Sequence, residues 1–260
     1  MKHLARIVAL ALLSALALQL YFLARVGLMA VVDPQSTTFQ RSEIWRIATE
    51  KHSLLWSQQW VAYERISPNL KRAVIASEDA GFAEHSGVEW DALEKAWERN
   101  QKAEARVEKI NEQLERRLQK ASPGKAPAPA KAVTRAVPKV IGGSTITQQL
   151  AKNLFLGGER SLLRKGQEFV ITFMLEACLS KQRILEIYLN NVEWGEGLFG
   201  AEAAARHYFH VAANALGTLQ AAQLAVMLPA PKRFEKRPGS AYVVGRAGTV
   251  SARMSAVELP

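Results

Sequence analysis

Residues 164–190 read RKGQEFVITFMLEACLSKQRILEIYLN, and this stretch decides the fold class. Apolar residues recur in it at helical spacing, first over residues 164–180 and then over residues 181–190. The same period returns in residues 145–154, 198–208 and 219–227. Because alternating strand patterns are scarce in the chain, we predict a mainly α-helical fold.

The composition is that of a folded protein. The chain has 260 residues, 48% of them hydrophobic, which allows one or two domains with a sizeable core. Its 34 Lys and Arg residues against 24 Asp and Glu residues give a net charge of +10. A single cysteine, Cys178, excludes an internal disulfide and a cysteine-based zinc site.

Residues 7–24, IVALALLSALALQLYFLA, carry no charge and begin an apolar run that extends with one interruption to Val32. At 1.5 Å per residue, a helix of this length approaches the roughly 30 Å of a bilayer core. The basic residues Lys2 and Arg6 precede it, which favours a cytoplasmic N-terminus and an exported body. A cleaved signal peptide with a small-residue site at residues 15–17 is the alternative, but the apolar run continues well past that site. We predict an uncleaved anchor, and export of the body in either case.

The positive charge is concentrated in residues 99–139, which hold 11 basic and 4 acidic side chains. Such an excess is typical of a segment that meets nucleic acid, a phospholipid surface or a phosphorylated substrate. A solvated helix and tail is the other interpretation, and the commoner one for charge runs. Since nucleic acid conflicts with export, we predict no nucleic-acid partner.

Residues 76–87, ASEDAGFAEHSG, place two adjacent carboxylates, Glu78 and Asp79, at the end of an apolar helical pattern. Partial burial beside an aromatic ring such as Phe82 raises the pKa of a carboxyl group, which suits a general acid or base. Ordinary surface or capping acids are the alternative for this window alone.

Residues 142–153, GGSTITQQLAKN, put two glycines and several hydroxyl side chains at the start of a helix. Unpaired backbone N–H groups and hydroxyls at such a start suit a phosphate or a sugar, and Lys152 lies further along the same helix. The spacing is not that of a nucleotide-binding P-loop. An ordinary capped helix is an equally good interpretation of this segment.

Residues 160–168, RSLLRKGQE, gather cations around a carboxylate. Arg164 and Lys165 precede Glu168 by four and three residues, so a helix brings all three to one face. Such cations keep a carboxylate ionised or receive a diphosphate, whereas a surface ion-pair ladder is the alternative. Two separated carboxylates and a diphosphate-sized set of cations on an exported body indicate glycosyl transfer from a diphosphate-linked sugar.

In this order, the three segments resemble the signature motifs of the peptidoglycan glycosyltransferases, family 51. Residues 181–191, KQRILEIYLNN, and residues 220–231, QAAQLAVMLPAP, resemble two further motifs of that family. With one apolar anchor, the chain is similar to the monofunctional biosynthetic peptidoglycan transglycosylases. This resemblance implies a lysozyme-like helical lobe beside a smaller, membrane-facing jaw lobe.

The resemblance also implies which residues form the site. Glu78 matches the general base of the family, and Glu168 matches a second carboxylate that organises the donor diphosphate. The remaining substrate-binding positions that the resemblance implies are Asp79, Ser144, Thr145, Gln148, Gln149, Lys152, Arg160, Arg164 and Lys165.

The substrates implied by the resemblance are lipid II and the growing lipid-linked glycan. They are joined by a β-1,4 link, with inversion at the donor carbon and release of polyprenyl diphosphate. The resemblance leaves a divalent cation, Mg²⁺ or Mn²⁺, open at the donor diphosphate, and it implies no organic cofactor. Membrane lipids and other cell-wall synthesis proteins are the further partners expected, and the bacterial inner membrane is the expected location.

The resemblance divides the chain into four parts. Residues 1–32 are the cytoplasmic N-terminus and transmembrane anchor, and residues 33–65 are a juxtamembrane linker and domain entry. Residues 66–237 are the glycosyltransferase domain, in which residues 99–140 form a charged, partly flexible jaw insertion. Residues 238–260 are a weakly patterned C-terminal tail.

Two other functions stay open on the sequence. A lysozyme-like lytic glycosidase needs two carboxylates but no cation cluster for a diphosphate. A non-catalytic cell-wall scaffold would use the basic segment as its binding element and would not need Glu78.

Overall fold

The computed structural model describes residues 2–120, 143–158 and 161–260, without the side chains of residues 117–120. Helix makes up 69% of the structure and strand 3%, which confirms the predicted mainly helical fold. Residues 121–140 of the predicted jaw insertion, and Arg160 of the candidate site, lie outside the described residues.

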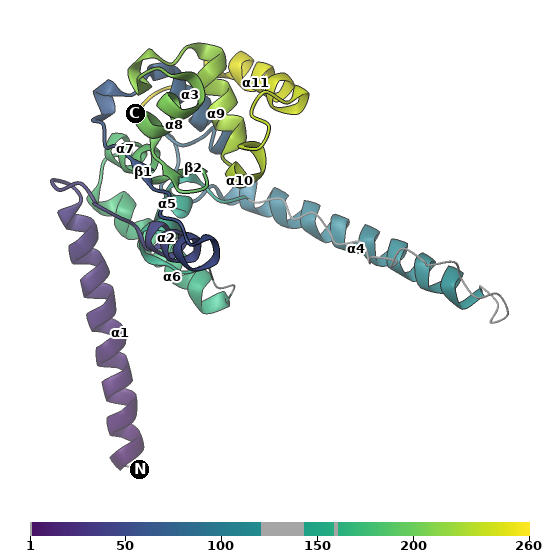
Figure 1. Ribbon diagram of the computed structural model, residues 1–260. Helices are drawn as coiled ribbons and strands as arrows, with labels where there is room; N and C mark the ends of the chain where they lie inside the picture. The colour runs from purple at the N-terminus through teal and green to yellow at the C-terminus, as the bar shows by residue number, and fades with distance from the viewer. Residues whose placement is uncertain (1, 121–142, 159–160) are drawn as a thin grey trace. The chain divides into compact units, whose positions relative to one another are not determined.

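The chain divides into two compact units, and the elements are labelled in Figure 1. One unit comprises Met1–Val88 and Thr145–Pro260, and the other comprises Glu89–Ser144. The helices are α1 (Lys2–Leu28), α2 (Thr38–Lys51), α3 (Pro68–Glu78), α4 (Trp90–Lys120), α5 (Ile146–Phe155), α6 (Leu162–Cys178), α7 (Lys181–Asn191), α8 (Ala201–Phe209), α9 (Thr218–Met227), α10 (Pro231–Phe234) and α11 (Ala241–Met254). The strands are β1 (Ser57–Gln58), β2 (Glu193–Gly195) and β3 (Leu198–Phe199).

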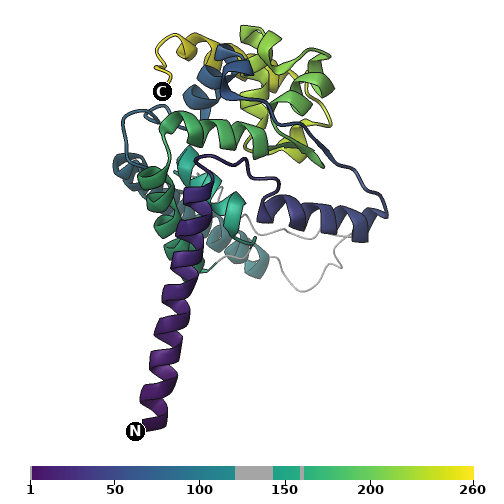
Figure 2. The ribbon, with the colours of Figure 1, turned by 90° about the vertical axis from the view of Figure 1, so that its left-hand side faces the viewer.

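Helix α1 is long and apolar enough to cross a membrane, and 6% of its most apolar window is buried. That exposure distinguishes it from a core helix of a soluble protein. Its C-terminal half lies against α6 (Figure 2), where Gln19 and Gln167 exchange two amide hydrogen bonds of 2.8 and 2.9 Å. Phe22 packs edge-on against Phe155 of α5, with 5.2 Å between the ring centroids. The apolar anchor is therefore docked on the folded body.

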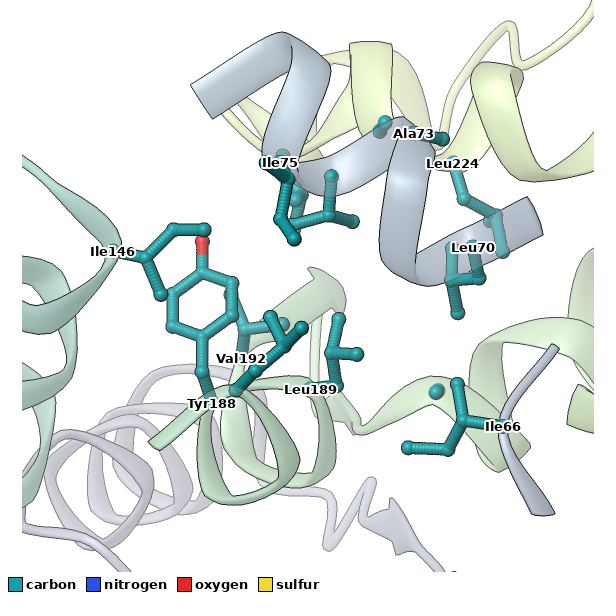
Figure 3. Packing of buried hydrophobic residues seen from close by; sticks show 14 of the residues in the cluster. Ile66, Leu70, Ala73, Ile75, Ile146, Tyr188, Leu189, Val192 and Leu224 are labelled. Carbon is teal, nitrogen blue, oxygen red and sulfur yellow. The ribbon is translucent and has the colours of Figure 1, made fainter. Parts of the chain in front are cut away.

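The core of the larger unit is built around α3. One side of α3 packs on α9 and α11, where Leu70 and Leu224 are fully buried. Ile75, near the end of α3, borders the same interior as Ile146 of α5 and Tyr188 of α7 (Figure 3). This packing fixes the C-terminal end of α3 beside two helices that carry further polar residues of the candidate site.

The three strands form one small sheet in the order β1-β3-β2. Strand β3 pairs in parallel with β1 and antiparallel with β2. The predicted helical pattern over residues 198–208 is corrected here, because Leu198 and Phe199 belong to this sheet and α8 starts only at Ala201. Gly200 separates them with a φ of +83°, and a Cβ atom there would lie 2.7 Å from the carbonyl oxygen of Asn190. Only glycine fits this position without strain.

Helix α2 begins at Thr38, within the expected juxtamembrane linker and domain entry of residues 33–65. Thr37 and Gln40 form a reciprocal capping box at its start, in which each side chain accepts a hydrogen bond from the other residue's backbone N–H. The Thr-x-x-Gln spacing is a known start signal for a helix and was present in the sequence.

Residues 238–260, expected as a weakly patterned tail, instead contain α11, which packs on α9 and α3. The physical reason is a narrow apolar stripe that closes the core. Its buried residues are Val243, Ala247, Val250 and Met254.

Candidate active site

Glu78 is the last residue of α3 and is half-buried. The side-chain amide Nε2 of Gln149, on α5, donates a hydrogen bond of 3.1 Å to its Oε2 atom. Burial raises the pKa of the Glu78 carboxyl group, and the neighbouring charge of Asp79 adds to this effect. The Gln149 hydrogen bond and the positive charge of Lys152 oppose it. Glu78 thus binds a proton more readily than an exposed glutamate does, as a general base requires.

Asp79 braces the segment that follows α3. Its carboxylate accepts a hydrogen bond of 2.9 Å from the backbone N–H of Ile146, at the start of α5, and lies 2.8 Å from Nε2 of His85. The Nδ1 atom of His85 accepts a hydrogen bond from the backbone N–H of Gly87, so this pattern assigns the ring proton to Nε2. Asp79 therefore ties the end of α3 to the start of α5, which supports the neighbouring Glu78.

Thr145 and Gln148 are buried at the start of α5, where they form a capping box. The Thr145 hydroxyl also donates a hydrogen bond of 2.7 Å to the carbonyl oxygen of Gly87. These contacts give both residues a role in holding the helix start, and their predicted substrate contact stays a prediction. Ser144, which precedes the cap, is half-buried and belongs to the smaller unit.

Glu168 lies in the second turn of α6, with 3% of its surface exposed. Arg164 Nη1 lies 3.3 Å from its Oε2 atom, and the Lys165 ammonium contacts its Oε1 atom. Ser161 caps the helix start and so fixes this turn. The predicted meeting of the three charged side chains on one helix face is confirmed.

Lys152 links the two carboxylates electrostatically. Its ammonium interacts with the charges of both Glu168 and Glu78, while desolvation and the charges of Arg164 and Lys165 lower its pKa. The side chain is exposed because it opens onto a cavity, yet the surrounding protein still removes part of its hydration.

A cavity of about 520 Å³ lies beside these groups. Gln149, Lys152 and Arg164 line it. Glu78 and Glu168 are not lining residues, but Glu78 is hydrogen-bonded to the lining Gln149 and Glu168 is paired with the lining Arg164. Its other lining residues include Phe39, Ser42, Glu43, Glu193, Pro229 and Pro231. The cavity thus has cations in one part and carboxylates in another.

Sequence reasoning missed Glu193 and Tyr188. Glu193 is 6% exposed and lies 3.6 Å from Lys232, and burial raises its pKa to about 7. The Tyr188 hydroxyl lies 2.9 Å from the Gln149 amide. The available signal was a polar side chain, Glu193 or Tyr188, among apolar neighbours. Their partners, Lys232 and Gln149, come from distant parts of the chain.

The expected divalent cation finds no protein cage among the described residues. They contain no group of three His, Cys, Asp or Glu side chains that could hold a metal ion. Both carboxylate oxygens of Glu168 already meet cationic side chains, whereas Mg²⁺ prefers several oxygen ligands.

Comparisons with known proteins identify the family of the chain. The family model described as Transglycosylase matches residues 48–124 and 124–255. A protein of Burkholderia orbicola is 48% identical over 94% of this chain and 86% of its own length, and one of Burkholderia thailandensis is 47% identical over 94% and 83%. A protein of Paraburkholderia phytofirmans is 45% identical over 100% of this chain and 93% of its own length.

All three relatives carry the name biosynthetic peptidoglycan transglycosylase. Both the family match and the relatives cover most of the chain. The covered part includes α5, which carries Lys152, and α6, which carries Arg164. The chain therefore belongs to the transglycosylase family and is a peptidoglycan glycosyltransferase.

Proposed function

We propose that the protein polymerises lipid II into β-1,4-linked glycan strands and releases polyprenyl diphosphate. The observation that carries this proposal is the shared cavity. Gln149, which is hydrogen-bonded to the half-buried Glu78, and Arg164, which is paired with Glu168, both line this cavity. Lys152 lies at the cavity wall and interacts with both carboxylates.

In the proposed reaction, Glu78 takes the proton from the 4-hydroxyl group of the acceptor sugar. The oxygen forms a bond to C1 of the donor sugar as the bond from C1 to the diphosphate oxygen breaks. Attack from the side opposite the leaving group inverts the centre and gives the β link. The raised pKa of Glu78 supports this role, because it makes the carboxylate a stronger proton acceptor.

The leaving diphosphate is stabilised by fixed cations. Lys152 and Arg164 line the cavity, and Lys165 contacts the same carboxylate as Arg164. Cations that are held in place before the reaction stabilise developing negative charge at little cost in reorganisation. Glu168 holds two of these side chains in place. Such a cluster favours a diphosphate-linked donor over the simple hydrolysis that a lytic glycosidase performs.

The position of α1 supports a substrate that is embedded in a membrane. Gln19 lies about 14 Å along the helix axis from the end of α1, and it is bonded to Gln167, the neighbour of Glu168. Leu162 and Leu163, at the start of α6, are 91% and 88% exposed. By the positive-inside rule, the N-terminus is cytoplasmic and the catalytic body lies on the outer side of the inner membrane.

The test is polymerisation of purified lipid II by the full chain and by Glu78→Gln. We expect long glycan and free polyprenyl diphosphate from the unaltered protein and almost no product from the variant. The matched control is Glu84→Gln, which makes the same change at an exposed position in the segment after α3 and should leave activity intact.

Equal polymerisation by Glu78→Gln and the unaltered protein would contradict the proposal. A second assay supplies finished glycan strands in place of lipid II. Release of soluble muropeptides from those strands, without polymer formation from lipid II, would establish the lytic glycosidase instead.

A further inference from the structure

A hydrogen-bonded chain leads from Glu78 into the core. The Tyr188 hydroxyl lies 2.9 Å from Oε1 of Gln149, and Nε2 of Gln149 lies 3.1 Å from Oε2 of Glu78. The three side chains come from α7, α5 and α3, so the chain crosses three packed helices. It is separate from the bracing of Asp79 by His85 and Ile146.

The direction of these hydrogen bonds follows from chemistry. An ionised carboxylate only accepts, so Gln149 must turn its NH₂ group toward Glu78 and its carbonyl oxygen toward Tyr188. Tyr188 must then donate. Burial and the negative charges of Glu78 and Asp79 raise the pKa of Tyr188 well above its ordinary value, which keeps the hydroxyl protonated.

Packing alone does not explain the hydroxyl group of Tyr188. The residue is 1% exposed, and its ring lies with Ile75 and Ile146 in the core (Figure 3). The neighbouring buried residues of α7 include Ile184, Leu185, Ile187 and Leu189. Phenylalanine would fill the same space without burying a polar atom, which is costly unless that atom is hydrogen-bonded.

We propose that Tyr188 is a positioning residue for the base: its hydroxyl fixes the orientation of the Gln149 amide, which in turn holds Glu78 as an ionised proton acceptor. This inference rests on the proposed function of Glu78. Without the hydroxyl, the carbonyl oxygen of Gln149 loses this donor, which makes an amide turned with its carbonyl oxygen toward Glu78 less unfavourable. That orientation repels the carboxylate and favours the protonated acid.

The groups that face Glu78 determine the direction in which Tyr188→Phe should shift its pKa. Asp79 raises its pKa, whereas Lys152 and the Gln149 hydrogen bond lower it. Tyr188→Phe leaves the first two groups in place and weakens the third. The pKa of Glu78 should therefore rise, and the acid limb of the pH–rate profile should move to higher pH.

The experiment measures the pH dependence of lipid II polymerisation by Tyr188→Phe, Gln149→Leu and the double variant. One neutral hydrogen bond contributes about 0.5–1.5 kcal/mol, so Tyr188→Phe should lower kcat about two- to tenfold, with KM unchanged. In the Gln149→Leu background the same substitution should have no further effect on kcat, because the amide through which Tyr188 acts is gone.

Tyr208→Phe is the matched control. Its hydroxyl donates a partly buried hydrogen bond of 2.8 Å to the carbonyl oxygen of Trp194 and does not contact Gln149 or Glu78. This variant should lose stability to a similar extent but keep the acid limb where it is. Glu78→Gln, assayed alongside, separates this inference from the proposed function.

Normal polymerisation by Glu78→Gln would overturn the proposed function and this inference together. If Glu78→Gln is inactive, two results overturn the inference alone. One is an unchanged acid limb in Tyr188→Phe, and the other is an equal loss of kcat from Tyr188→Phe with and without Gln149.

Discussion

Glu78 and Glu168 are the same kind of side chain in two different environments. Glu78 is half-buried, accepts a hydrogen bond from the neutral Gln149 amide and has a raised pKa. Glu168 is 3% exposed and is held between Arg164 and Lys165. A neutral donor leaves the Glu78 carboxylate able to take a proton, whereas ion pairs with two cations occupy both oxygens of Glu168. This difference supports the proposed roles, in which Glu78 transfers the proton and Glu168 positions the cations.

The largest expected effect on the polymerisation rate comes from substituting Glu78, and comparison with Glu168 separates the proposed roles of the two carboxylates. Glu78→Gln should lower the polymerisation rate by about 10²–10⁴, because a general base contributes that much. Glu168→Gln should lower it by about 10–10³, through misplacement of the cations that stabilise the leaving group. Single-turnover rates with lipid II give both numbers. A Glu168→Gln variant that loses more activity than Glu78→Gln would reverse the assignment.

A smaller effect on activity is expected from substitution of Lys152, which interacts with both Glu78 and Glu168. Lys152→Met should lower kcat/KM about 10–100-fold, because one of several fixed charges at the diphosphate is lost. It should also move the acid limb of the pH–rate profile upward, since Lys152 lowers the pKa of Glu78. Lys236→Met, the same change at an exposed lysine, is the control and should alter neither. Full activity of Lys152→Met would contradict the proposed role of Lys152 at the diphosphate and beside Glu78.

The acidic part of the cavity gives a pH-dependent prediction for stability. The pKa of Glu193 is raised from 4.5 to about 7, so its ionisation in the folded state is unfavourable. Below pH 4.5 the folded and unfolded states are both protonated and no penalty exists, whereas above pH 7 the penalty is complete. Glu193→Gln should therefore raise Tm at pH 8 by a few degrees and have little effect at pH 4. Thermal unfolding at the two pH values checks this, and an equal shift at both would contradict the cause given.

The smallest effect on activity is expected far from both carboxylates, on α11. Val250 is 3% exposed, and Val250→Ala should lower the free energy of unfolding by about 1–2 kcal/mol without changing the pH–rate profile. Val244 is 49% exposed on the same helix, so Val244→Ala makes the same chemical change at the surface. Equal destabilisation by the two variants would mean that α11 does not close the core.

The sequence predicted the parts of the site that depend on local spacing. Arg164 and Glu168 are four residues apart on one helix, so helical periodicity brings them together without further information. Glu78 and Lys152 followed from motif order and family resemblance. The cavity that Lys152 lines also takes residues from α2, α6 and the segments around Glu193 and Pro229, and their meeting depends on packing that spacing does not determine.

Tyr188 and Glu193 were missed for a related reason. The role of Tyr188 depends on Gln149, which is 39 residues away, and the raised pKa of Glu193 depends on burial near Lys232. Helix α11 was missed because Gly245 and Gly248 interrupt its apolar stripe and favour a loop. In each case tertiary contacts, rather than local preference, decide the outcome.

The most direct test of the difference between Glu78 and Glu168 is the pH dependence of single-turnover polymerisation by the unaltered protein, Glu78→Gln and Glu168→Gln. The account predicts an acid limb in the unaltered protein and in Glu168→Gln, because both retain the titrating base. It predicts a flat residual rate in Glu78→Gln. An acid limb that persists in Glu78→Gln and disappears in Glu168→Gln would contradict the account.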